Sequence, residues 1–228
     1  MKFTHTSNGS LVILSGGLDS TVCMAIARKA ESGNLVAVTF DYGQKARVEI
    51  DRAAQIAGHY GCEHLVVALD VSRWGGSSLV DPGLEIPSAD QGQQGSIPNT
   101  YVPARNIIFL SVALGICEAR DLSHAYIGVN SLDYSGYPDC RPEFIEAFSK
   151  VARVGQKRGI EGNPVSIVTP LISMSKAEII EVGQQLNAPL GLSWSCYNNF
   201  SAPCGTCESC YLRSKGFSQV GIEDESLI

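Results

Sequence analysis

A pair of glycines flanked by hydroxyls and a carboxylate follows the first strongly apolar run of the chain, in the stretch LVILSGGLDST at residues 11–21. An apolar run that leads into a helix-like sequence is typical of a buried strand that turns sharply into a helix. The first amides of such a helix have no partner within it, and beside a glycine turn they favour an anion. Ser15, Ser20 and Thr21 add hydroxyl donors. The stretch therefore predicts a phosphate-binding loop.

Two glycines and one acid give this loop its special character. Gly16 and Gly17 are expected to allow a positive φ and a close approach of the backbone to the ligand. The stretch lacks the Gly-Lys-Ser/Thr ending of a nucleoside triphosphatase P-loop and the spaced glycines of a dinucleotide site. A carboxylate would repel bound phosphates unless it holds magnesium or caps the helix, so we expect Asp19 to bind the metal or order the loop. The alternative is a plain strand-turn-helix corner with a capping Asp or Ser.

Four of the eight cysteines lie close together near the end of the chain, with the spacing C-x7-C-x2-C-x2-C. Four thiolates suit a tetrahedral zinc ion with no position left open for water or substrate, which would make the zinc structural. An iron–sulfur cluster is the main alternative, because cysteine ligands do not choose between the metals. A zinc deaminase needs a His-x-Glu, which the sequence lacks. The predicted ligands are Cys196, Cys204, Cys207 and Cys210.

Apolar, β-rich runs alternate with helix-like stretches along most of the chain. Near-continuous apolar runs are typical of parallel strands that helices cover on both faces. In SKAE, Ser175 and Glu178 form a predicted capping box at the start of a helix. The expected strands are 11–15, 35–40, 64–69, 125–129 and 165–169, and the expected helices are roughly 20–31, 45–60, 106–120, 142–158 and 176–187.

The length of 228 residues suits one large α/β domain with a small appendage. We expect an open, doubly wound parallel sheet over residues 1–190 and a metal-binding segment over residues 191–228. The stretch 72–104 is rich in Gly, Ser, Pro and Gln and has no helical or strand period, so it is predicted to be a long, lid-like loop.

Composition and charge bear on the partners of the chain. The formal net charge of −6 argues against a broad nucleic-acid surface, which needs clustered Lys and Arg. No apolar run is long enough to span a bilayer. The first residues lack the apolar stretch of a secretory signal, so we expect a cytoplasmic chain whose thiols are free or metal-bound.

The stretch GVNSLDYSGYPDCRPEF at residues 128–144 follows a predicted strand, which places it at the same edge of the sheet as the phosphate loop. Its carboxylates can accept from ring N–H and amine donors, its tyrosines offer flat faces, and its arginine offers a fork for a carboxylate. The combination suits an acidic, guanine-like ring. The alternative is an ordinary turn in which one Asp caps the next helix and the arginine is solvated. The candidate residues are Asp133, Tyr134, Tyr137, Asp139 and Arg141.

Several motifs carry a resemblance to known families. SGGLDS resembles the loop of the N-type ATP pyrophosphatases, which adenylate an oxygen of their substrate and release pyrophosphate. Together with DYGQKARVE (41–49), YVPARN (101–106), DYSGYPDCRPEF and CGTCESC, it makes the chain resemble the 7-cyano-7-deazaguanine synthases of the queuosine pathway, from the first strand to the last cysteine. One departure is the absence of an expected histidine at or beside Ala46.

The resemblance implies a carbon–nitrogen ligase that uses ATP with magnesium. Such enzymes convert 7-carboxy-7-deazaguanine and ammonia to the 7-cyano product through adenylated carboxylate and amide intermediates, and they release AMP and pyrophosphate. It also implies a structural zinc ion and a homodimer that acts on small molecules, without nucleic acid or membrane. No glutaminase portion fits in this length, so ammonia would arrive free or from a partner.

The same resemblance distributes roles over the site. Ser15, Asp19, Arg105 and Lys176 form the predicted catalytic group, in which Arg105 and Lys176 offset phosphate charge. The alternatives are a surface salt bridge for Arg105 and a solvated side chain for Lys176. Arg141 would hold the carboxylate of the substrate. The predicted ATP-binding residues are Leu14, Ser15, Gly16, Gly17, Leu18, Asp19, Ser20, Thr21, Thr39 and Phe40, the last two beside the adenine.

Two rival functions follow from the same pattern. A tRNA thiolase or a lysidine-type ligase would need a basic docking surface, which the net charge disfavours, and sulfur transfer would need a reactive cysteine such as Cys140. A non-catalytic adenine-nucleotide sensor of the universal-stress type would need neither Asp19 nor the clustered thiols.

Overall fold

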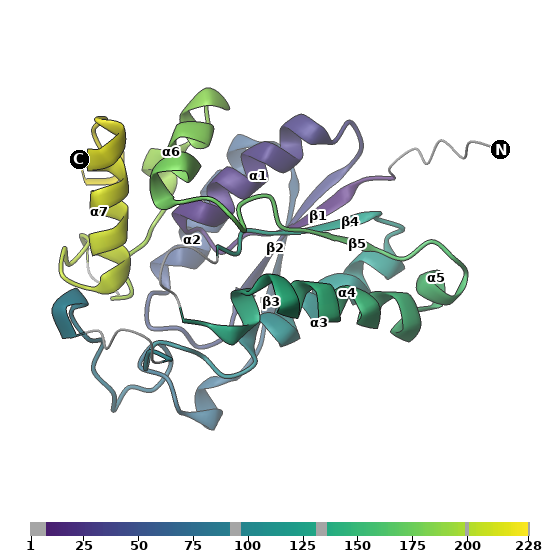
Figure 1. Ribbon diagram of the computed structural model, residues 1–228, viewed down its shortest axis with the longest axis horizontal. Coiled ribbons are helices and arrows are strands. Elements are labelled where there is room, and N and C mark those ends of the chain that lie inside the picture. The colour runs from purple at the N-terminus through teal and green to yellow at the C-terminus, as the bar shows by residue number, and fades with distance from the viewer. Residues whose placement is uncertain (1–7, 92–96, 131–135, 199–200, 228) are drawn as a thin grey trace.

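The computed structural model describes residues 8–91, 97–130, 136–198 and 201–227. At its centre lies a five-stranded sheet in the order β3-β2-β1-β4-β5, and its neighbouring strands are parallel (Figure 1). The chain moves outward from β1 to β3 and returns to place β4 on the other side of β1, which is the doubly wound arrangement that the alternation predicted. The strands are β1 (Ser10–Ile13), β2 (Leu35–Asp41), β3 (Glu63–Ala68), β4 (His124–Ile127) and β5 (Ser166–Val168).

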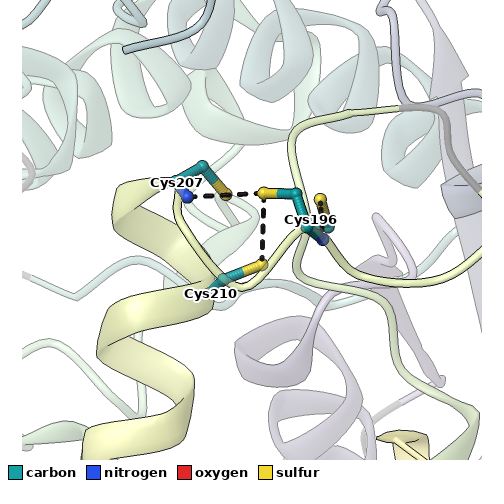
Figure 2. Close-up of side chains that lie close together, drawn as sticks. Cys196, Cys207 and Cys210 are labelled. Atoms are coloured by element: carbon teal, nitrogen blue, oxygen red, sulfur yellow. Dashed lines mark hydrogen bonds between the residues drawn. The ribbon is translucent and has the colours of Figure 1, made fainter. Parts of the chain in front are cut away.

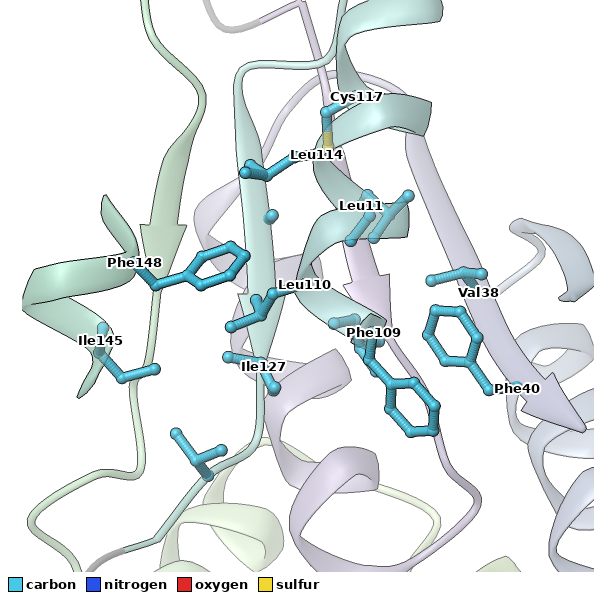
Figure 3. Close-up of a cluster of buried hydrophobic side chains, with 14 of the residues drawn as sticks. Leu11, Val38, Phe40, Phe109, Leu110, Leu114, Cys117, Ile127, Ile145 and Phe148 are labelled. Atoms are coloured by element: carbon cyan, nitrogen blue, oxygen red, sulfur yellow. The ribbon is translucent and has the colours of Figure 1, made fainter. Parts of the chain in front are cut away.

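Helices cover both faces of the sheet (Figure 1). Helices α1 (Leu18–Ala30), α2 (Val48–His59) and α6 (Lys176–Gln185) pack on one face, and their buried side chains share a cluster with Val12, Leu14 and Ala37. Helices α3 (Arg105–Ala119) and α4 (Pro142–Gly155) pack on the other. The side chains of that second cluster include Leu11, Val38, Phe40, Phe109, Leu110, Ile127, Ile145 and Phe148 (Figure 3).

Successive side chains of β1 and β2 point to opposite faces of the sheet, which explains why there is one buried cluster on each face. Leu11 and Ile13 face α3, whereas Val12 and Leu14 face α1, because successive side chains of a strand point to opposite faces. Both sets are buried, so the strand reads as a continuous apolar run. The pattern that predicted a parallel sheet is therefore the direct result of burial on two sides.

The predicted helix 142–158 is divided in the structure. Helix α4 ends at Gly155, Gln156 is extended with φ −116° and ψ 149°, and the short α5 follows over Lys157–Ile160. Gly159 allows this tight return, since a Cβ there would lie 2.3 Å from the carbonyl oxygen of Ala152. The other predicted helices are confirmed to within a few residues at their ends.

A further helix, α7 (Glu208–Val220), was not predicted from the sequence. It packs against α6, and Phe217 of α7 shares a buried cluster with Leu18 and Ile180. Gly221 ends the helix in the left-handed conformation at φ 77°, which is the glycine signal that sequence reasoning overlooked. The C-terminal segment is thus joined to the α/β body by apolar packing.

The long stretch 72–104 is anchored to the C-terminal segment. It contains two short 3-10 helices, η1 (Ser72–Trp74) and η2 (Ala89–Gln91). Ser88, directly before η2, pairs with Cys207 in an antiparallel bridge. The amide of Ala89, the first residue of η2, donates to the carbonyl of Thr206 over 2.9 Å. Short helices η3 (Pro138–Cys140), η4 (Leu190–Leu192) and η5 (Glu225–Leu227) complete the described elements.

The capping box at the start of α6 is confirmed. The Ser175 hydroxyl accepts from the Glu178 amide over 3.3 Å, and the Glu178 carboxylate accepts from the Ser175 amide over 2.7 Å. Replacing Ser175 with alanine is expected to lower the free energy of unfolding by about 1 kcal/mol, because an amide of the first turn loses its partner. The exposed Ser214 of α7 offers a control, whose alanine variant should change it by less than about 0.5 kcal/mol. Equal urea midpoints for the two variants would contradict the capping role.

Within the described ranges, none of the helices combines the length and apolarity that crossing a bilayer requires.

Candidate active site

A cavity of about 270 Å³ opens at the carboxyl edge of the sheet. The segments that follow β1, β2 and β4 line it, as do the first residues of α3 and α6 and the C-terminal segment. Parallel strands place their following loops at one edge, which is where ligands bind in open α/β sheets. The predicted site residues that line the cavity are Leu14, Ser15, Gly17, Leu18, Asp19, Ser20, Phe40, Arg105, Tyr137 and Lys176.

The hydroxyls of the predicted phosphate loop mostly hold the loop itself. Those of Ser20 and Thr21 donate to the carbonyl of Gly17 over 3.0 and 2.9 Å. The Ser15 hydroxyl accepts from the Gly17 amide over 3.2 Å and lies on the exposed wall of the cavity. Helix α1 therefore begins at a well-defined loop, and Gly17, its N-cap residue, has no side chain to occupy the first amides.

Gly16 and Gly17 were both expected to adopt a positive φ beside the ligand, but the structure shows that they differ. Gly16 has φ 86°, and a Cβ there would lie 2.2 Å from the Glu49 carbonyl oxygen, so the packing of α2 already requires a glycine. Gly17 has φ −78°, which any residue adopts, and its Cβ would meet no atom closer than the Ser15 hydroxyl at 3.3 Å. The expectation of a positive φ is therefore wrong for Gly17.

These two glycines form a matched pair of tests. Gly16→Ala is expected to lower the free energy of unfolding by about 3 kcal/mol or more, because the new methyl group overlaps a backbone oxygen at a left-handed φ. Gly17→Ala, one residue away, should lower it by less than about 1 kcal/mol. Guanidinium denaturation measures both, and similar losses for the two variants would contradict the account of Gly16.

Asp19 and Lys176 form an ion pair at the cavity wall. The Lys176 Nζ donates to both carboxylate oxygens of Asp19, over 2.7 and 2.8 Å, and the two side chains are 15% and 26% exposed. Gly216 of α7 lies against the Lys176 stem, where a Cβ would come within 2.7 Å of Cγ. Lys176 is thus held against the phosphate loop and is not a freely solvated side chain.

Arg105 also lines the cavity, where it lies between two tyrosines. Its Cζ is 5.9 Å from the ring centroids of both Tyr42 and Tyr137, and its Nη1 donates to the Tyr42 hydroxyl over 3.5 Å. Both rings are buried, at 7% and 8% exposure. The alternative of a surface salt bridge for Arg105 is not seen among the described residues, since its guanidinium faces the cavity and the rings.

Thr39 and Phe40 separate onto opposite faces of β2. Phe40 lines the cavity and stacks on Phe109 with centroids 4.0 Å apart. The Thr39 hydroxyl donates to the Leu14 carbonyl over 2.6 Å and lies 2.7 Å from His64 Nε2, within the sheet. Thr39 is 1% exposed and does not line the cavity. The strand period explains why only one of two adjacent residues reaches the site.

Of the predicted ring-binding residues that the structure describes, one lines the cavity and two do not. Tyr137 lines the cavity, and its hydroxyl donates to Thr100 Oγ1 over 2.8 Å. Asp139 is buried outside the lining, where its carboxylate accepts from the Asn106 amide at the start of α3 over 3.0 Å. Arg141 is exposed and lies at the N-cap of α4, away from the cavity lining. Asp133 and Tyr134 lie outside the described residues.

Glu49 and Tyr42 line the cavity but were given no role from the sequence. Burial raises the pKa of Glu49 to about 8, and the nearby positive charge of Arg105 opposes that rise. Much of this carboxyl group is therefore protonated at neutral pH. Both residues lie in the motif DYGQKARVE, which begins at the last residue of β2. Because ligands bind beyond the ends of parallel strands, the position of this motif could have identified the two residues as candidates for the site.

The four predicted cysteine ligands converge. Their Sγ atoms all lie within 4.8 Å of one another, and Cys204 Sγ is 4.0 Å from Cys210 Sγ. Thiol hydrogen bonds from Cys207 and Cys210 lower the pKa of Cys196 well below its usual range (Figure 2). Backbone amides also point at the sulfurs, such as that of Cys207, which donates to Cys204 Sγ over 3.4 Å. The arrangement can hold one metal ion.

The cysteine cluster is continuous with the cavity wall. Ser195 and Tyr197, the neighbours of Cys196, line the cavity, and so does Ser209, the neighbour of Cys210. Trp194 also lines it, and its backbone amide donates to the Gly16 carbonyl over 2.8 Å. A group bound by the four thiolates would therefore fix one wall of the cavity.

Known proteins resemble this chain over nearly its whole length. The family model "Queuosine biosynthesis protein QueC" matches residues 9–221. The 7-cyano-7-deazaguanine synthase of Leptospira biflexa is 47% identical over 99% of this chain and 96% of its own length. The synthase of Acetivibrio thermocellus is 50% identical over 94% of this chain and 95% of its own.

A solved structure with a similar fold is the NMN synthetase of Francisella tularensis, with a TM-score of 0.50 and 13% identity over 95% of this chain and 79% of that one. At this identity the likeness supports the fold alone. The family match spans the phosphate loop, the cavity wall and all four cysteines, and it shows that this chain belongs to the queuosine biosynthesis protein QueC family.

Proposed function

We propose that this chain converts 7-carboxy-7-deazaguanine and ammonia to 7-cyano-7-deazaguanine at the expense of two ATP. The observation that supports this best is the cavity, which combines the loop SGGLDS, the Asp19–Lys176 ion pair and an arginine flanked by tyrosines. The chain is also about half identical to proteins named 7-cyano-7-deazaguanine synthase. A carboxylate at pH 7 is a poor electrophile. Transfer of AMP to one of its oxygens creates the leaving group that ammonia displaces.

The reaction requires two similar rounds. In the first, a carboxylate oxygen attacks the α-phosphorus of ATP and pyrophosphate leaves, after which ammonia attacks the carbonyl carbon and AMP leaves with that oxygen. In the second, the amide oxygen attacks another ATP, and loss of AMP and the amide protons gives the nitrile. In each round the protein must align two substrates and stabilise the negative charge of the phosphates, and no side chain acts as a covalent nucleophile.

Triphosphate would bind where β1 turns into α1. Ser15, Gly17 and the first residues of α1 line the cavity there, and their amides and the Ser15 hydroxyl would hold the phosphates. The carboxylate of Asp19 would hold magnesium, which neutralises phosphate charge when bound. Both Asp19 oxygens accept from Lys176, so we propose that Lys176 leaves Asp19 and moves to a phosphate oxygen as the nucleotide arrives. Phe40 would contact the adenine.

The four cysteines would hold a structural zinc ion. A tetrahedral ion with Zn–S bonds of about 2.3 Å keeps its sulfurs about 3.8 Å apart, close to the 4.0 Å between Cys204 and Cys210. All four positions are cysteines, so no ligand position remains for water or substrate. We therefore assign the metal to the stability of the cavity wall and give it no part in the chemistry.

Incubation with ATP, an ammonium salt and 7-carboxy-7-deazaguanine tests the proposed reaction. Mass spectrometry should detect the nitrile, with two AMP formed for each nitrile. Omitting ammonium should stop nitrile formation. Tight, salt-sensitive binding of tRNA, together with no nitrile, would instead favour the tRNA-modifying rivals.

A further inference from the structure

Among the described residues, three cationic side chains line the cavity, and they differ in the groups that pair with them. Lys176 pairs with Asp19, and the guanidinium of Arg213 pairs with Asp224 through hydrogen bonds of 2.6 and 2.8 Å. Among the residues that the structure describes, no carboxylate forms an ion pair with Arg105; its contacts are the hydroxyl of Tyr42 and two tyrosine faces. Two carboxyl groups, those of Asp139 and Glu49, act on Arg105 only from beyond ion-pair distance, and burial favours the neutral form of Glu49. An anionic ligand could therefore pair with Arg105 without displacing a carboxylate that is already bound to it.

The position of Arg105 in its helix is unfavourable for helix stability. It is the first residue of α3, where the helix dipole repels a cation. The residue before it, Ala104, has φ 59°, a left-handed conformation that is strained for a residue with a Cβ. A strained residue and an unfavourably placed charge at one point of the backbone indicate that the direction of this side chain is under functional constraint.

Arg105 and the predicted phosphate site reach the cavity from opposite faces of the sheet. It comes from α3, on the face of the sheet that holds Phe40 and Ile127, whereas Asp19 and Lys176 come from helices that pack on the other face. The rings of Tyr42 and Tyr137 flank it, which gives a flat ring substrate an apolar wall beside a fork of N–H donors. Arg141, the residue expected to hold the carboxylate, lies outside this wall.

We propose that Arg105, held between Tyr42 and Tyr137, binds the carboxylate of the ring substrate and makes the site bind the acid more tightly than the neutral amide intermediate and nitrile product. This assignment rests on the proposed function, because it needs a carboxylated ring as the substrate. A cation at this position allows the carboxylate to approach the anionic triphosphate. Conversion to the amide removes the negative charge but leaves a carbonyl oxygen that can still accept from Arg105 during the second round. The nitrile has lost both oxygens, so Arg105 holds it least tightly and the product is released.

Binding of two ring compounds tests the assignment. Titration calorimetry would compare 7-carboxy-7-deazaguanine with 7-amido-7-deazaguanine, with and without a non-hydrolysable ATP analogue. We expect the wild-type chain to bind the acid about 30-fold more tightly than the amide, and Arg105→Gln to bind the two within about threefold of each other. The affinity of Arg105→Gln for the amide and the ATP analogue should stay within about threefold of wild type. Arg105→Lys keeps the charge but not the fork, so it should retain part of the preference.

The controls separate this assignment from the proposed function. Arg73→Gln, on the exposed η1, should leave every affinity unchanged. A preference for the acid that survives in Arg105→Gln and disappears in Arg141→Gln would overturn the assignment alone. So would an equal loss of affinity for the acid and the ATP analogue, which would place Arg105 on the phosphates. A wild-type chain that binds neither ring compound would overturn the proposed function, and the assignment with it.

Discussion

Asp19→Asn is expected to lower kcat/KM for substrate-dependent pyrophosphate release by about 10²- to 10³-fold. The substitution keeps the size of the side chain but removes the charge that pairs with Lys176 and that would bind magnesium. A neutral amide cannot balance the Lys176 ammonium, so Lys176 would take another position, and the metal would lose its anionic ligand. A coupled assay for pyrophosphate, with the carboxylated deazaguanine and ammonium present, measures the effect.

Asp70→Asn provides the control for this substitution. Asp70 lies on the surface, 56% exposed, beside Arg73, and its neutralisation should leave the rate unchanged. Thermal denaturation shows whether Asp19→Asn still folds. A folded Asp19→Asn with a rate within about threefold of wild type would contradict the role of the Asp19–Lys176 pair at the phosphates.

Loss of one cysteine ligand is expected to have the largest effect on stability. Cys210→Ser should lower the bound zinc from one ion per chain to almost none and lower the free energy of unfolding by about 5 kcal/mol. Cys207 is the N-cap residue of α7 and pairs with Ser88 of the long loop, so loss of the metal should also destabilise the loop and the cavity wall. Elemental analysis and chemical denaturation, both under reducing conditions, measure the two effects.

Cys62→Ser is the matched control, since Cys62 is half-buried and lies far along the chain from the cluster. It should keep one zinc ion per chain. Visible absorption of the purified wild-type chain distinguishes the alternatives, because a zinc thiolate site is colourless and an iron–sulfur cluster is not. A colourless chain whose stability is unchanged by Cys210→Ser would contradict a structural role for the metal.

Most of the fold was predictable because burial on two faces leaves a direct trace in the sequence. The apolar runs of β1, β2 and β4 and the capping box at Ser175 can each be recognised within a few consecutive residues of the sequence. Helix α7 was missed because its apolar side chains are few and its packing on α6 depends on Gly216 and Phe217, which meet residues distant in the chain. The break at Gln156 depends on Gly159 in the same way.

The site was predictable in its motifs and less so in its individual roles. The phosphate loop and the cysteine cluster are local in sequence, and the structure brings each together. The directions of Thr39, Asp139 and Arg141 depend on strand register and helix starts, which motif spacing does not specify. Tyr42, just after β2, and Glu49, in the first turn of α2, both line the cavity, which motif spacing likewise does not specify.

Oxygen transfer from the substrate to AMP tests the central claim most directly. The chain would be incubated with ATP, ammonium and 7-carboxy-7-deazaguanine that carries ¹⁸O in both carboxylate oxygens. If both oxygens are adenylated in turn, each nitrile formed should be accompanied by two AMP, each with one ¹⁸O, and the pyrophosphate should be unlabelled. Label in pyrophosphate or orthophosphate, or AMP without label, would show that the acid does not attack the α-phosphorus and would contradict the account.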